Sequence, residues 1–265
     1  MIDMRKKSIR FRFSEITKLY HFTSVESACK IIQSGKLRFS KACRLNDLIE
    51  SNRVVWERTF SGYIPDDQAY LCYAEEEMRR YQQISFSQDR VVGDCYYLGF
   101  DLHTMWGLYA DRGYGVCLVF DKEKLTLHPE DYAAEVKYVN LIPQGVMIHN
   151  KSERGIKSEI KRRREQIFYY KRKEWEYEQE YRILRRAKKQ TDDEYLDISD
   201  ALVCVIICKD QSIDYLESMF DSEIYHKLRS LEKKLPVLTY EYDLDGYTLY
   251  ESFGVPLWSE QCGDM

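Results

Sequence analysis

The sequence predicts an α+β fold in a single domain. Its 265 residues are 44% apolar and 32% charged, a composition typical of a globular chain with a buried core. Short apolar segments typical of strands are mixed with segments of helical periodicity, and the two kinds do not alternate regularly. A doubly wound parallel sheet is therefore disfavoured. We find no internal repeat and no low-complexity linker, so we expect residues 141–155 to form a loop rather than a domain boundary.

Residues 19–40 carry the clearest local signals. Residues 19–22 are predicted to form a short strand, and Thr23 and Glu26 have the spacing of a capping box at a helix start. The apolar side chains of this helix lie on one face: Val25, Ala28, Ile31 and Ile32. Gly35 is typical of the residue that ends a helix, and residues 37–40 are predicted to form a strand again.

The remaining elements follow from the same signals. Residues 44–58 are expected to form a turn followed by a helix that Asn46 or Asp47 caps, and further helices are expected over residues 66–83, 103–110 and 152–169. The last of these is basic, with three isoleucines facing inward: Ile156, Ile160 and Ile167. Strands are expected at residues 84–87, 116–120, 135–139, 203–208, 237–242 and 247–253, the C-terminal ones completing the sheet.

The charge and cysteine content limit the cellular setting. Net charge is −4, which does not indicate a nucleic-acid-binding protein by bulk charge. The eight cysteines form no C-x-x-C pair and no zinc spacing, and Cys204 and Cys208 are expected to pack as small apolar residues in a strand. No signal-peptide core and no apolar stretch of about 20 residues is present. We therefore expect a cytoplasmic protein with reduced thiols, no membrane segment and no metal.

The segment Trp175–Arg182 is the first candidate for chemistry. With a period of two, Glu176, Glu178, Glu180 and Arg182 share one strand face and aromatic side chains share the other. Carboxylates at this spacing are expected to raise one another's pKa, as general acid/base chemistry requires. In a helix, by contrast, Glu178 and Arg182 would be an ordinary ion pair on a solvated face. The periodicity favours the strand.

Three further groups of side chains are candidate ligand contacts. His21 and Thr23 lie where a strand meets a helix N-terminus, which suits a phosphate, although a structural histidine and a capping threonine are the ordinary alternative. Arg44 offers a planar fork to phosphate beside Asn46, although a capped helix with a surface arginine explains both. The third group is the aromatic pair Trp106 and Tyr109, which would either stack on a ligand ring or fill the core.

Taken in order, these motifs resemble a known bacterial family. A series of short motifs follows over about residues 19–210: YHFTS, LRFS, LND, ISFS, MWGLYA, GYGVCLVF and KEWEYEQEYRI. This series is similar to the family called domain of unknown function 2971. The opening stretch also resembles bacterial ADP-ribosyltransferase toxins that modify nucleic acid, through Tyr20, His21, Thr23, Gly35 and Leu37. No G-x-S-x-G, P-loop or G-x-G-x-x-G motif is present, which disfavours serine hydrolases, P-loop nucleotidases and Rossmann oxidoreductases.

The resemblance to the transferases implies a split β-sheet core and a site for NAD, used as a substrate. It implies that His21 and Thr23 contact NAD and that Glu180 is catalytic with Glu178 as its neighbour, although both glutamates fit that position. The middle-strand residue of the transferases has only loose counterparts in Ser85, Ser87 and Tyr109. The expected activity is ADP-ribosyl transfer to nucleic acid or protein, or NAD hydrolysis, in a toxin or phage-defence effector.

Two other functions remain open. The first is a non-catalytic module that binds a nucleotide on the same fold. The second is a metal-dependent nuclease that uses Asp47, Glu50, Glu178 and Glu180, although Arg182 stands beside the last two.

The basic residues 161–164 and 171–173 could contact nucleic acid, but such a run is more often the solvated face of a helix.

Overall fold

The chain forms two compact units in a computed structural model. The structure describes residues 17–42, 54–56, 73, 75–92, 95–141, 146–148, 152–208, 235–243, 246–251 and 255–261. Unit 1 comprises Met1–Lys36, Phe86–Thr126 and Asp197–Met265, and unit 2 comprises Leu37–Ser85 and Leu127–Leu196. The two units are interleaved in the sequence, and the division falls inside one strand, β5 (Tyr81–Gln88).

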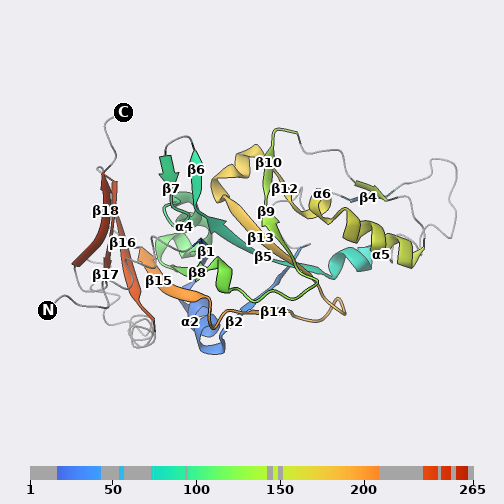
Figure 1. The fold of residues 1–265 in the computed structure, drawn as a ribbon, viewed down its shortest axis with the longest axis horizontal. Coiled ribbons are helices and arrows are strands. Elements are labelled where there is room, and N and C mark those ends of the chain that lie inside the picture. Colours follow the sequence, from blue (N-terminus) through green and yellow to red (C-terminus); the bar gives the residue numbers. More distant parts are fainter. Residues whose placement is uncertain are drawn as a thin grey trace. The chain divides into compact units, whose positions relative to one another are not determined.

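Unit 1 is built on a mixed sheet (Figure 1). Its strands follow the order β18-β17-β16-β15-β8-β1, and the last residues of β5 pair with β1. β15 and β16 are parallel, whereas the pairs β1/β8, β8/β15, β16/β17 and β17/β18 are antiparallel. The strand bounds are β1 Lys18–Thr23, β8 Val116–Asp121, β15 Leu202–Cys208, β16 Val237–Asp243, β17 Gly246–Glu251 and β18 Val255–Gln261. β18 had no counterpart among the sequence-based predictions.

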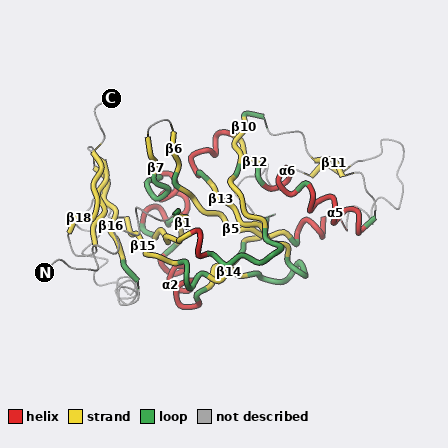
Figure 2. Tube along the Cα trace, in the orientation of Figure 1, coloured by secondary structure: helices red, strands yellow, loops and turns green. Residues whose placement is uncertain are grey.

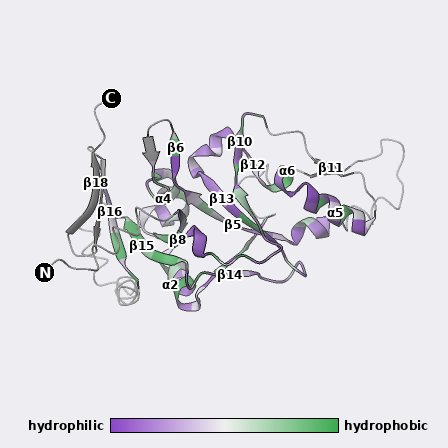
Figure 3. Cartoon of the chain, in the orientation of Figure 1, coloured by the Kyte–Doolittle hydropathy of each residue, from purple (hydrophilic) through white to green (hydrophobic). Residues whose placement is uncertain are grey.

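The interior of unit 1 is apolar. Every residue of β8 is buried, and β15 is drawn largely in the hydrophobic colour in Figure 3. Cys117 and Cys204 lie fully buried in these two strands, where burial raises the pKa of both thiols. Cys204 therefore packs as the small apolar residue that the sequence predicts, and Cys208 is half-buried.

Further elements of unit 1 are β6 Arg90–Val92 and β7 Cys95–Tyr97, α4 His103–Tyr109, and the 3₁₀ turns η2 Asp111–Gly113 and η3 Lys122–Lys124.

The first helix, α2 (Val25–Ser34), begins one residue later than the capping box predicts. Thr23 is the last residue of β1, and the Ser24 hydroxyl accepts a hydrogen bond from the Ser27 amide at 3.2 Å. Ser24 has extended backbone angles with a hydroxyl in reach of the first turn, so it caps the helix in place of Thr23. The predicted end is confirmed, because Gly35 has φ +66° in the left-handed conformation that ends helices.

Unit 2 contains β13 (Glu180–Arg186), which is antiparallel to β9 (Tyr132–Glu135) and neighbours β5. β3 (Ser40–Lys41) pairs with the start of β5. Three short pairs complete the strands: β10 Lys137–Val139 with β12 Tyr170–Arg172, β4 Val54–Trp56 with β11 Val146–Ile148, and β2 Lys36–Arg38 with β14 Tyr195–Asp197. The first two of these pairs are parallel. Parallel pairing joins segments far apart in the sequence, which local signals do not predict.

Two consecutive helices of unit 2, α5 (Glu153–Arg162) and α6 (Arg164–Phe168), replace the single basic helix expected over residues 152–169 (Figure 2). Their inward face is confirmed, since Ile156, Ile160 and Ile167 are at most 1% exposed. These side chains join Tyr169 and Leu184 in one apolar cluster of the unit. An apolar stripe on otherwise charged helices is therefore sufficient to turn one face of α5 and α6 toward the core.

Other predictions need correction. Residues 54–56, expected inside a helix, form strand β4, and the rest of residues 44–58 lies outside the described residues. Residues 75–79 are helical, but residues 81–83 belong to β5 and not to a helix. The α+β class is confirmed, with a large mixed sheet and several helices. No helix among the residues described is long and apolar enough to cross a membrane.

Candidate functional site

The candidate carboxylates lie at the junction of a 3₁₀ helix and a strand. Residues Lys173–Glu178 form η4, so the strand predicted for this whole segment is wrong before residue 180. Gln179 has φ 46° in the left-handed region, and this turn starts β13 at Glu180. From Glu180 onward the alternation of a strand holds, and Arg182 shares the face of Glu180. The turn at Gln179, rather than a strand, brings Glu178 close to this pair.

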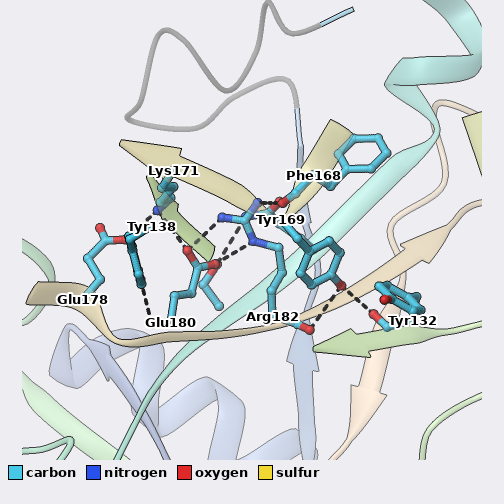
Figure 4. A network of polar contacts seen from close by, with 10 residues as sticks. Tyr132, Tyr138, Phe168, Tyr169, Lys171, Glu178, Glu180 and Arg182 are labelled. Atoms are coloured by element: carbon cyan, nitrogen blue, oxygen red, sulfur yellow. Dashed lines mark hydrogen bonds and ion pairs between the residues drawn. The ribbon is translucent and has the colours of Figure 1, made fainter. Parts of the chain in front are cut away.

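Glu180 is held by two cations (Figure 4). Arg182 donates through Nε to Oε1 at 2.7 Å and through Nη2 to Oε2 at 2.8 Å. Lys171 Nζ lies 2.9 Å from Oε2 of the same carboxylate. Glu180 is 3% exposed and Arg182 1%, so this bidentate pair is withdrawn from solvent. In such surroundings a charge-assisted pair is much stronger than on a surface.

The cluster also contains Glu178 and Tyr138. Lys171 Nζ donates to Glu178 Oε2 at 2.5 Å, so one ammonium joins the two carboxylates. The Tyr138 hydroxyl accepts a hydrogen bond from the Glu180 amide at 2.8 Å. Two carboxylates and two cations therefore balance in charge within one buried group. We call these five residues the Glu180 cluster: Tyr138, Lys171, Glu178, Glu180 and Arg182.

A second set of hydrogen bonds, to backbone carbonyl oxygens, surrounds Arg182. Its Nη1 donates to the Phe168 carbonyl, so the guanidinium joins Glu180 to the backbone at the end of α6. The Tyr169 hydroxyl lies 2.6 Å from the Tyr132 carbonyl and 3.2 Å from the Arg182 carbonyl (Figure 4). These contacts pair side-chain donors with backbone carbonyl oxygens in a buried region. The guanidinium is thus held in one orientation before any ligand arrives.

The charge state of Glu180 corrects the prediction that neighbouring glutamates raise each other's pKa. Burial alone would raise the pKa of Glu180. The charges of Arg182 and Lys171 outweigh that effect, and hydrogen bonds from Arg182 and Ser85 add to it. The pKa of Glu180 is consequently well below its ordinary value, and the carboxylate stays ionised throughout the neutral range. Opposite charges brought in by the fold decide the shift, not the neighbouring carboxylate.

Ser85 joins the Glu180 cluster from β5. Its hydroxyl hydrogen bonds to Glu180 and accepts a hydrogen bond from Gln83 Nε2 at 3.2 Å. Ser85 is exposed, although its strand neighbours Ile84 and Phe86 are only 2% exposed. Glu180 therefore meets Ser85, one of the three loose counterparts of the middle-strand residue of the transferases, within unit 2. An exposed residue of β5 therefore contacts the buried carboxylate.

The comparisons with known proteins give one match. A family model described as a protein of unknown function (DUF2971) matches residues 105–183. No curated protein and no solved structure matches the chain. The DUF2971 segment contains the whole Glu180 cluster, and it leaves out Ser85, His21 and Thr23. The similarity is thus narrower than the range of residues 19–210 that the sequence motifs suggest.

The other predicted contacts within the described chain belong to unit 1. Thr23 ends β1, and the half-buried His21 ring lies edge-on to Phe86 with 5.9 Å between ring centroids. Trp106 is 3% exposed, donates its indole N–H to the Phe100 carbonyl at 2.8 Å and stacks on Tyr240. One face of its ring is therefore already covered. Tyr109, three residues further along α4, is half-buried.

Several predicted residues cannot be placed. Arg44 and Asn46 lie outside the described residues, as do Asp47 and Glu50 of the nuclease hypothesis. Within the part of the chain that the structure describes, no group of three or more His, Cys, Asp or Glu side chains has the geometry to hold a metal ion.

Sequence reasoning missed the roles of Lys171 and Tyr138. Lys171 belongs to a basic run expected on a solvated surface, yet it is 6% exposed. It is buried because β12 pairs in parallel with β10, which places Tyr138 opposite Lys171. The available signal is a lysine between Tyr170 and Arg172 in a short strand, where one of two alternating faces must turn inward. That signal alone does not name the carboxylates that Lys171 meets.

Proposed function

We propose that this chain is an ADP-ribosyltransferase-like protein that binds NAD and uses Glu180 as its reactive carboxylate. The observation that carries the proposal is the contact between Ser85 and Glu180. Ser85 is one of the loose counterparts of the middle-strand residue of the transferases, and it hydrogen bonds to Glu180, the counterpart of their catalytic glutamate. NAD is the substrate in this proposal, and nucleic acid or protein is the acceptor.

In this reaction the bond between nicotinamide and ribose breaks, and its electron pair leaves with nicotinamide. The ribose carbon becomes cationic in the transition state, as in glycoside hydrolysis. An ionised carboxylate next to that carbon stabilises the cation. The lowered pKa of Glu180 suits this electrostatic role and not proton abstraction, because a general base works best with a pKa near the working pH. The acceptor then attacks the ribose carbon and loses its proton to another base or to water.

The buried ion pairs define what must change when NAD binds. Both oxygens of Glu180 already accept hydrogen bonds from Arg182, and Oε2 also meets Lys171. The Lys171 ammonium has Glu178 as a second partner at 2.5 Å. Movement of the Lys171 ammonium away from Glu180, with its contact to Glu178 kept, would therefore free one side of Oε2 without leaving either charge unpaired. In the proposal, Glu178 is the residue that holds Lys171, and Glu180 is the residue that faces the ribose.

The test is nicotinamide release from NAD by purified protein, with and without nucleic-acid or protein acceptors. Glu180→Gln should lower the rate at least about 100-fold, in the range found for residues that stabilise a developing charge. Ser85→Ala should lower it by a smaller factor. The matched control is Glu174→Gln, an exposed glutamate of η4 whose side chain is 58% exposed, and it should leave the rate unchanged. A wild-type rate that Glu180→Gln does not lower contradicts the proposal.

A second candidate, a non-catalytic nucleotide-binding module, is favoured by one observation. Glu180 is 3% exposed and fully paired, an arrangement that also suits a structural ion pair in the core. NAD would then raise the melting temperature without being consumed. A thermal shift by NAD together with no nicotinamide release, in wild-type protein and in all variants, would assign the chain to this class.

The nuclease hypothesis gains no such support. A divalent cation binds where carboxylates lack another positive partner. Lys171 and Arg182 already supply two positive charges to Glu178 and Glu180. Magnesium-dependent cleavage of DNA or RNA that chelator abolishes would revive this alternative.

A further inference from the structure

A basic cavity lies in unit 2, apart from the Glu180 cluster. Its volume is about 70 Å³ and it opens to solvent. It lies between helices α5 and α6 and the strands β5, β9 and β13, and the proposed function uses none of its residues. Eight residues line it: Tyr81, Glu130, Tyr132, Lys157, Lys161, Arg164, Leu184 and Arg186.

Cations dominate this lining, with four basic side chains against one carboxylate. Arg186 is paired with the buried Glu77 at 2.5 and 2.7 Å, and Lys161 lies 4.0 Å from Glu130. Within the described part of the chain, Lys157 and Arg164 are not paired with any carboxylate. The cavity therefore keeps an excess of positive charge after its own ion pairs are formed, and an anion would relieve the repulsion between these cations.

The fold holds these cations around the same cavity. Lys157 and Lys161 are four residues apart and share one face of α5, and Arg164 is the first residue of α6, after the break at Arg163. The adjacent face of α5 is anchored in the core by Ile156 and Ile160. The rest of the helix is drawn mainly in the hydrophilic colour in Figure 3. Regular secondary structure thus carries the cations, so little backbone ordering is needed when an anion binds.

Aromatic side chains complete the cavity. The Arg164 guanidinium lies 4.1 Å from the centroid of the Tyr132 ring, which restrains its plane and leaves its N–H groups at the edge. Tyr81 is 4% exposed, and burial raises the pKa of its hydroxyl, so the group remains protonated and able to donate. The cavity thus offers a guanidinium, ammonium groups and a phenol, all of them hydrogen-bond donors.

The volume limits what can enter. An apolar cavity of roughly 150 Å³ accommodates benzene, which has six heavy atoms. A cavity about half as large accepts a five-atom phosphate group whose outer oxygens face solvent. Phosphate also matches the donors, because it carries up to two negative charges and binds arginine through two parallel hydrogen bonds.

We propose that this cavity binds a phosphate group of a ligand whose remaining part lies outside it, with Lys157 and Arg164 as the main contacts. The phosphate comes either from a small phosphorylated compound or from the backbone of a nucleic-acid strand. The binding site is independent of catalysis at Glu180, so the proposal stands or falls separately from the proposed function.

The experiment compares two double variants on the same pair of helices. Lys157→Gln/Arg164→Gln removes the two cations that lack a carboxylate partner. The matched control, Arg154→Gln/Arg162→Gln, removes the same charge from exposed positions of α5 that do not line the cavity. Circular dichroism and the melting temperature without ligand check that both variants fold. Lys157→Gln alone, at an exposed position, serves as the test if the double variant does not fold.

Two probes distinguish the sources of phosphate: pyrophosphate, by thermal shift, and a labelled single-stranded oligonucleotide, by fluorescence anisotropy. Removal of the charge-assisted hydrogen bonds should weaken binding of a recognised probe at least about tenfold in the first variant and less than twofold in the control. If the ligand is nucleic acid, the slope of log affinity against log salt should fall by about 0.7 for each phosphate that the variant no longer neutralises. Binding of pyrophosphate alone assigns a small phosphorylated ligand.

Equal weakening in both double variants would overturn the proposal, because it would show general attraction to a basic surface. Absence of binding of either probe to the wild-type protein would overturn it as well.

Discussion

Glu180 shows how the charge of a single side chain depends on contacts made by distant parts of the chain. Arg182, two residues away on the same face of β13, supplies two hydrogen bonds. Lys171 approaches from β12 and Ser85 from β5. Burial opposes the charge, but these three partners together reverse that effect and lower the pKa of Glu180. Each partner removed should therefore expose the cost of burying the carboxylate.

The first prediction concerns Arg182. Arg182→Met leaves Glu180 buried with one cation fewer and should lower the free energy of unfolding by about 3–5 kcal/mol, the usual cost of breaking a buried pair on one side. The matched change, Arg172→Met, affects a side chain that is 47% exposed and pairs with Glu174 at 3.6 Å. It should change stability by less than about 0.5 kcal/mol. Urea denaturation of both variants measures the difference. Equal losses would show that the buried pair does not stabilise unit 2.

The second prediction is a dependence on pH. Because the pKa of Glu180 is lower in the folded protein than its ordinary value of 4.5, its ionised form stabilises the fold above that value. This contribution is lost as pH falls through the folded pKa. The difference in unfolding free energy between wild type and Glu180→Gln should thus be constant from pH 7 to pH 5 and shrink below about pH 4.5. Urea titrations at several pH values test this. A difference that already shrinks between pH 7 and pH 5 would contradict the lowered pKa.

The contacts of a site residue could be predicted only where its partners lie close to it in the sequence. Glu180 and Arg182 are two apart in a strand, so their shared face follows from alternation alone. Lys171 reaches Glu180 through the parallel pairing of β10 and β12, and no local pattern specifies that pairing. The turn at Gln179 could not be predicted either, because a non-glycine residue with φ 46° has no simple sequence signal. The carboxylates could therefore be predicted, and the cations that set their charge could not.

Elements were predicted best where one periodicity ran unbroken. The isoleucine stripe of α5 and α6 and the apolar strand β8 both follow from spacing alone. Segment 173–182 was harder, because its alternating glutamates and aromatics fit a strand, whereas its first part is the 3₁₀ helix η4. Boundaries also shifted where two residues could serve as the cap, as Thr23 and Ser24 do before α2.

The third prediction uses two glycines in helical surroundings. Gly35 ends α2 with φ +66°, and a Cβ there would lie 2.6 Å from the Ser199 hydroxyl oxygen. Gly107 lies within α4, where an added Cβ would meet nothing within 4 Å. Gly35→Ala should therefore destabilise the protein by about 1 kcal/mol or more, whereas Gly107→Ala should stabilise it by about 0.5–1 kcal/mol. Thermal melts of both variants give the two signs. Stabilisation by Gly35→Ala would contradict the left-handed helix end.

At the scale of the whole molecule, neither compact unit is a continuous stretch of sequence. The chain passes from one unit to the other after residues 36, 85, 126 and 196. The segment that matches the DUF2971 model, residues 105–183, therefore includes parts of both units. It contains the Glu180 cluster but lacks β5, the strand that supplies Ser85. A match of this extent marks a shared sequence pattern and not a self-contained structural unit.

The fourth prediction follows from that interleaving. A fragment of residues 105–183 should not fold alone, because β1 and β15, the neighbours of β8, are missing and β13 is cut before its end. Circular dichroism and a proton–nitrogen NMR spectrum of the fragment should show an unfolded chain, whereas the full chain gives dispersed signals. A well-dispersed spectrum of the fragment would show that the matched segment folds without these strands.

The central claim is that Glu180 is the carboxylate that meets the ribose of NAD. A crystal of the full chain soaked with a non-hydrolysable NAD analogue tests it most directly. We predict density for the analogue with its nicotinamide ribose within hydrogen-bond distance of Glu180 and Ser85, and with Lys171 moved away from Glu180 while it still contacts Glu178. Density for the analogue elsewhere on the chain, with Glu180 still enclosed by Arg182 and Lys171, would contradict the claim.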